Sequence, residues 1–135
     1  MPQTNQISLT SRQVLSFIDD GFVRIENPFS TDLAKQCRDE LWADIGLSPD
    51  EPKTWTQPVV RMGWKCSTPF IDAANTPQLY QAYGQLAEEG RWLALEGLGT
   101  FPIRFPSSEY ADDDGWHVDM SFGNTNPDSW NGVPM

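Results

Sequence analysis

The stretch from Leu98 to Phe122 limits the possible folds more than any other part of this sequence. Gly97 to Pro106 has the composition of an extended segment, but Pro102 and Pro106 have no backbone N–H to donate to a β-ladder. An acidic turn follows, and Trp116 to Phe122 is then expected to be extended again. We therefore predict two strands separated by a turn, with the first strand irregular or at a sheet edge.

The second of these strands contains His117, the only histidine in 135 residues, and Asp119 follows two positions later. Side chains two positions apart on a strand point to the same face, so the imidazole and the carboxylate would project side by side. This is the pair that a two-histidine, one-carboxylate iron site takes from a single strand. The same spacing also suits a structural hydrogen bond between the two side chains, and the pair alone does not separate these readings.

Three segments around the pair carry a family resemblance: Gly97-Leu98-Gly99-Thr100-Phe101-Pro102-Ile103-Arg104-Phe105-Pro106, then Gly115-Trp116-His117-Val118-Asp119, and more loosely Phe17 to Ile25. They resemble the phytanoyl-CoA dioxygenase family of Fe(II)- and 2-oxoglutarate-dependent oxygenases. The resemblance implies a double-stranded β-helix, a jelly-roll-like fold. It also implies Fe(II) held by His117 and Asp119, with 2-oxoglutarate as the cosubstrate.

The resemblance extends only to these first two ligands. In such folds a second histidine, and an arginine that binds the 2-oxoglutarate carboxylate, lie on later strands, whereas here no second histidine exists and no arginine follows Arg104. Arg104 and Arg61 each lie between apolar neighbours, and either could bind a cofactor carboxylate. Arg104 is not assigned the role of the family's 2-oxoglutarate arginine. An ordinary solvent-facing arginine is the alternative at both positions.

Composition excludes several other classes of function. Nine basic and nineteen acidic residues give a net charge of −10, which argues against partners such as nucleic acid or an anionic membrane surface. No signal peptide or membrane-spanning stretch is recognisable, and we expect a cytoplasmic location. Cys37 and Cys66 lack a metal-type spacing. Cys37 lies on the apolar face of an expected helix, which favours a buried thiol over a disulfide.

Capping residues predict three helices. The first runs from Thr10 to Asp20, the second from Thr31 to Ile45, and the third from Thr76-Pro77 to Gly90. Short strands are expected at Phe22–Ile25 and Val59–Met62, with a loop over 47–58 between the second helix and the latter strand. Asp39 and Glu40 lie opposite the apolar stripe of the second helix, where we expect a solvated face. Residues 123–135 are rich in turn formers and are expected to be irregular.

These observations predict one domain over residues 1–135, of the α+β class. Three helices would pack on one side of a partial antiparallel sheet, an incomplete double-stranded β-helix. The expected function is that of the N-terminal part of a non-haem Fe(II)/2-oxoglutarate-dependent dioxygenase that hydroxylates a small molecule. With only two protein ligands for iron, the isolated chain is expected to be inactive. The alternative is a non-catalytic remnant or interaction module of the same fold. Exposed strand faces would favour self-association or a complementing chain.

Overall fold

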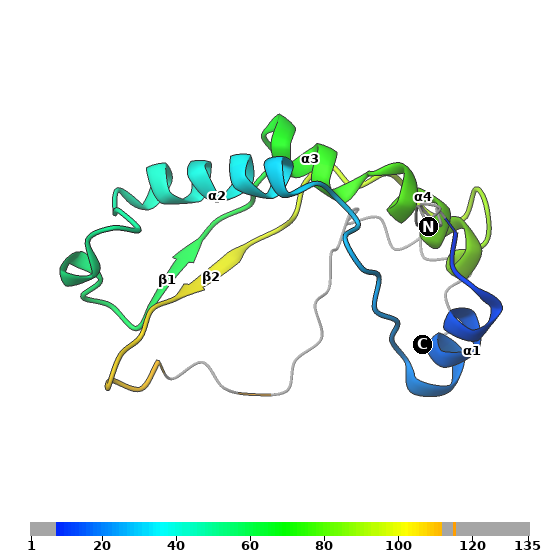
Figure 1. Cartoon of the computed structure of the whole chain (residues 1–135), viewed down its shortest axis with the longest axis horizontal. Helices are drawn as coiled ribbons and strands as arrows, with labels where there is room; N and C mark the ends of the chain where they lie inside the picture. Colours follow the sequence, from blue (N-terminus) through cyan, green and yellow to red (C-terminus); the bar gives the residue numbers. More distant parts are fainter. Residues whose placement is uncertain (1–7, 112–114, 116–135) are drawn as a thin grey trace, which may run out of the picture.

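The computed structural model describes residues 8–111 and residue 115. The elements follow the order α1 (Ser11–Asp20), α2 (Thr31–Ile45), a 3-10 turn (Pro52–Thr54), β1 (Val59–Met62), α3 (Thr68–Ala74), α4 (Pro77–Ala87) and β2 (Phe101–Arg104). Strands β1 and β2 pair in an antiparallel, two-stranded sheet, called here the ribbon. The described part therefore combines helices with a small antiparallel sheet, as an α+β protein does. It is elongated, with the ribbon and α2 at one end and α1 and α4 at the other (Figure 1).

Local capping explains where the long helices begin and end. Thr10 accepts a hydrogen bond from the Gln13 N–H, and the Gln13 side chain accepts one from the Thr10 N–H, which completes a capping box. At the start of α2, the Ser30 hydroxyl oxygen accepts a hydrogen bond from the Leu33 N–H. Gly21 and Gly46 close the two helices in the left-handed conformation, with φ of 81° and 68°. The predicted bounds of these two helices are confirmed.

The sequence prediction missed one helix and extended another too far. Helix α3 was not predicted, although it begins Thr68-Pro69 and buries Phe70. The helix predicted to end at Gly90 stops at Ala87, because Glu88 already has a left-handed φ of 72°.

The strand predicted at Phe22–Ile25 is wrong. These residues form an irregular segment, and the Phe22 side chain is 68% exposed. The described residues contain a single ladder, between β1 and β2, so this segment has no neighbouring strand there with which to pair. The β preference of Phe, Val and Ile comes mainly from packing against neighbouring strands, so without such a strand it does not stabilise an extended conformation here.

The main core lies between α2, α3 and the ribbon. Phe70 is fully buried, and its ring lies 5.5 Å from that of Phe101 on β2. Cys37 and Ala73 complete the buried cluster, and the partly buried side chains packed against it are Leu33, Leu41 and Phe101. Of the three predicted helices, only α2 packs against the sheet, and the unpredicted helix α3 packs beside it. Helices α1 and α4 lie at the other end of the molecule (Figure 1). The expectation that all three predicted helices pack on the sheet is therefore wrong.

Polar contacts fasten α2 to the segment that leads from β1 into α3. Ser67 donates its hydroxyl hydrogen to the Glu40 carboxylate, with oxygen–oxygen distances of 2.6 and 2.7 Å. Lys65, only 12% exposed, forms an ion pair with Asp44. Glu40 is therefore not on a solvated face as predicted, whereas Asp39 is exposed and pairs with Lys35 one turn away. The prediction failed for Glu40 because its partner is 27 positions away in the sequence.

Three side chains fasten more distant segments to one another. The Asn75 amide donates to the Leu95 carbonyl (2.7 Å) and accepts from the Leu95 N–H (2.9 Å). Gln85 on α4 forms the same two-bond arrangement with the backbone of Leu9. The Thr76 hydroxyl, besides capping α4, donates to the Pro28 carbonyl at 2.7 Å. These contacts satisfy backbone groups that have no ladder partner.

The two cysteines are free, with Cys37 buried and Cys66 exposed, so the predicted buried thiol is confirmed. Burial, and less strongly the nearby Glu40 carboxylate, raises the pKa of the Cys37 thiol. We expect Ellman's reagent at pH 8 to modify one thiol rapidly and the second only on unfolding. Cys66→Ser should abolish the rapid phase, whereas two rapid phases in the native protein would contradict this assignment.

No helix in the described part of the chain combines the length and the apolar character needed to cross a membrane.

Candidate functional site

The ribbon presents two chemically different faces. Val59 pairs with Arg104 and Arg61 pairs with Pro102, so these four residues share one face. The opposite face carries Val60, Met62, Phe101 and Ile103. Along β1 only Arg61 is exposed, and along β2 exposed residues alternate with half-buried ones. One face is therefore apolar, and the other carries both arginines.

The apolar face is the one that the helices cover. Phe101 contacts Phe70 of α3, and Phe105, which continues the alternation beyond β2, is buried against two tryptophans. The Phe105 ring centroid lies 5.2 Å from that of Trp55 and 5.9 Å from that of Trp42 on α2. Because successive side chains of a strand alternate, Arg61 and Arg104 project away from α2 and α3.

The two arginines occupy diagonal positions of the ladder. Arg61 is opposite Pro102, and Arg104 lies two residues further along β2. Diagonal neighbours are separated by about 7–8 Å between their backbones, within reach of long side chains. Both residues also make further interactions within the protein. The ladder register therefore puts two guanidinium groups on one face of the ribbon, and guanidinium groups are chemically suited to carboxylates.

Hydrogen bonds beyond both ends of the ladder hold this face in place. The Phe105 N–H donates to the Pro58 carbonyl at 3.0 Å. At the other end the Lys65 N–H donates to the Gly99 carbonyl (2.9 Å), and the Lys65 carbonyl accepts from the Leu98 N–H (3.0 Å). Two four-residue strands would be only marginally stable alone, but these hydrogen bonds and the packing against α2 and α3 stabilise the ribbon.

The predicted iron ligands His117 and Asp119 lie outside the described residues, as does the segment 123–135. Strand β2 ends at Arg104, thirteen positions before His117. Among residues 8–111 and residue 115, no group of three histidine, cysteine, aspartate or glutamate side chains is placed to hold a metal ion. The described part therefore brings Arg61 and Arg104 onto one face and does not itself provide an iron site.

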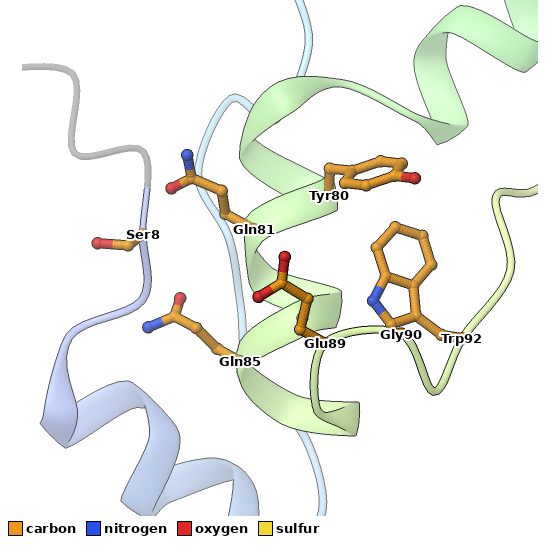
Figure 2. A pocket seen from close by; sticks show the side chains of 8 residues that line it. Ser8, Tyr80, Gln81, Gln85, Glu89, Gly90 and Trp92 are labelled. Carbon is orange, nitrogen blue, oxygen red and sulfur yellow. The ribbon is translucent and has the colours of Figure 1, made fainter.

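The structure also contains a pocket of about 650 Å³ beside α4, which sequence reasoning did not predict. Its lining includes Tyr80, Gln81 and Gln85 of α4, together with Glu89 and Trp92 from the loop that follows (Figure 2). The four-residue spacing of Gln81 and Gln85 predicts a shared helix face and was the available signal. The return of Trp92 onto α4 depends on the loop's conformation, which the sequence pattern did not indicate.

Comparison with known proteins adds no relative: no family model, curated protein or solved structure matches this chain. The functional argument therefore depends on the chain's own residues and on their arrangement.

Proposed function

We propose that this chain is the N-terminal part of a non-haem Fe(II)/2-oxoglutarate-dependent dioxygenase that resembles the phytanoyl-CoA dioxygenase family. One observation carries the proposal: a ribbon with a helix-covered apolar face and a second face that carries both arginines precedes His117 and Asp119 in the sequence. In a jelly-roll-like barrel, one face of each strand lines the interior and the other faces outward. The ribbon would supply early strands of such a barrel.

The residue types fit the two groups that the reaction needs. A neutral imidazole nitrogen of His117 and a carboxylate oxygen of Asp119 would hold Fe(II). Iron held there would let O2 react with 2-oxoglutarate, so that one oxygen atom enters succinate with release of CO2 and the other hydroxylates a C–H bond of a small-molecule substrate. Arg61 and Arg104 could bind a carboxylate bidentately and so orient the cosubstrate or an acidic substrate. The protein's contribution would be to position these molecules and to keep water out.

The ligand set in this sequence is incomplete, because His117 is its only histidine. A reactive site of this type needs three protein ligands on one face of the metal. We therefore expect weak metal binding by the isolated chain and no efficient turnover, with a complementing chain as one possible source of the third ligand.

A titration with Mn(II), an oxygen-stable substitute for Fe(II), tests this proposal. Free Mn(II) is followed by its electron paramagnetic resonance signal, with and without 2-oxoglutarate. We expect weak, saturable binding that 2-oxoglutarate strengthens, since it supplies further oxygen ligands. His117→Ala should weaken the binding about tenfold or more, equivalent to about 1.4 kcal/mol.

Asp113→Asn provides the matched control, because it removes one charge from the acidic turn before His117 without touching the two ligands. Its Mn(II) affinity should stay within about twofold of the original, because Asp113 is not one of the two predicted ligands. Equal loss in both variants would mean that the acidic turn collects the metal nonspecifically. Binding that is unaffected by His117→Ala would refute the iron site and favour the alternative, a non-catalytic interaction module.

A further inference from the structure

The pocket beside α4 contains an acidic group that has no partner among the described residues. Of the described residues that line the pocket, Glu89 alone is charged, and its carboxylate makes no hydrogen bond or ion pair with any of the described residues. The adjacent charges neutralise each other, since Arg91 pairs with Glu88 at 3.1 Å. In a chain with a net charge of −10, this leaves a negative site that attracts cations and repels anions.

Two aromatic rings line the pocket next to Glu89. The ring centroids of Tyr80 and Trp92 are 4.2 Å apart in an edge-on arrangement, and Tyr83, which is not among the lining residues, contacts the same indole at 5.0 Å. Figure 2 shows the Glu89 carboxylate between this aromatic pair and the glutamines of α4. Aromatic faces attract cations through their quadrupole, most strongly in tryptophan. Because two tyrosines fix the indole, little ordering is needed when a ligand binds.

The remaining lining is small or uncharged, so it does not compete with Glu89 for a cation. The Gln85 amide is already occupied by the backbone of Leu9, whereas Gln81 makes no hydrogen bond with the described residues. Gly84 leaves the helix surface open: a Cβ there would lie 3.9 Å from the Trp92 indole nitrogen. A larger side chain at this position would project toward the pocket.

From this combination we infer that the pocket binds an organic cation with an alkylammonium head group, held between the Glu89 carboxylate and the Tyr80–Trp92 pair. A metal ion would require several oxygen ligands, whereas the lining offers one carboxylate. The volume of about 650 Å³ leaves room for a substituent beyond the head group. The pocket is at the opposite end of the molecule from the ribbon, so the inference is independent of the proposed iron site (Figure 1).

A titration with choline chloride tests the inference on the intact chain, followed by the indole ¹H–¹⁵N signals. Trp92→Phe assigns the Trp92 signal by its disappearance. We expect choline to shift that signal saturably, with a dissociation constant on the order of 1 mM. The neutral analogue 3,3-dimethylbutan-1-ol, which has the same shape without the charge, should bind at least about fivefold more weakly. Sodium chloride at matched ionic strength should cause no saturable shift.

Glu89→Gln and Glu88→Gln form a matched pair of variants. Each removes one carboxylate from the same loop, but only Glu89 lines the pocket, while Glu88 pairs with Arg91. Choline binding should weaken about fivefold to tenfold in Glu89→Gln and stay within about twofold in Glu88→Gln. Tyr80→Leu, at a half-exposed position, should also weaken it. Equal losses in the two glutamate variants, equal binding of the neutral analogue, or no shift of Trp92 would overturn the inference.

Discussion

Phe70→Ala is expected to unfold this protein or nearly so. Phe70 is the largest side chain that the described residues bury completely, and it links α3 to Phe101 on β2. Truncation of a buried phenylalanine costs about 3–5 kcal/mol through lost transfer energy and the cavity left behind. The surrounding core is small, and the free energy of unfolding of a natural domain is only about 5–15 kcal/mol in total. Urea unfolding followed by circular dichroism at 222 nm measures the loss.

Leu93→Ala is the control for Phe70→Ala, because it removes a large apolar side chain that is 88% exposed. Its unfolding free energy should change by no more than about 0.5 kcal/mol. Phe70→Leu retains most of the buried apolar surface, so its unfolding free energy should lie between those of Phe70→Ala and Leu93→Ala. A Phe70→Ala protein as stable as Leu93→Ala would show that the core is not centred on this ring.

Gly97→Ala is expected to have the next largest effect, about 2–4 kcal/mol of destabilisation from strain and lost hydrogen bonds. A Cβ at Gly97 would lie 2.2 Å from the Lys65 carbonyl oxygen and 3.1 Å from the Trp64 indole nitrogen. The carbonyl cannot move freely, since it accepts the Leu98 N–H and the Lys65 N–H is itself bonded to Gly99. The backbone would have to separate, which would break the bonds that continue the ribbon.

Gly63→Ala tests whether the effect is steric. Gly63 follows β1 directly, has no left-handed φ, and would place a Cβ in open space. Its unfolding midpoint in urea should match that of the original protein or exceed it slightly, because alanine reduces the entropy of the unfolded chain. Similar losses in Gly63→Ala and Gly97→Ala would contradict the close approach at Gly97.

The helices that sequence patterns predicted well are those whose ends are fixed by neighbouring residues. Thr10 with Gln13, Ser30, Gly21 and Gly46 act over at most four positions, so their effect can be read without knowing the fold. Helix α3 was missed because seven residues hold too little periodicity. Its signals, a proline in the first turn and buried Phe70, Ala73 and Ala74, take on meaning only beside α2 and β2.

The site could be predicted in its residue types but not in its arrangement. Sequence alternation indicated that Arg61 and Arg104 each point opposite to their neighbours, yet only the register shows that they share a face. That register joins residues 39 to 45 positions apart in the sequence. The failed strand at Phe22–Ile25 illustrates the same limit, because pairing depends on a partner strand that local sequence does not identify. The pocket beside α4 likewise depends on the loop that brings Trp92 back to the helix.

The attachment of the first helix sets it apart from the rest of the fold. Helix α1 has no buried residue, and between residues 8 and 30 only Leu9 is buried. Gln85 and Thr76, both at α4, hold this stretch through its backbone at Leu9 and Pro28. Because few contacts hold residues 8–30, we expect this segment to open locally at a lower free-energy cost than the core around Phe70.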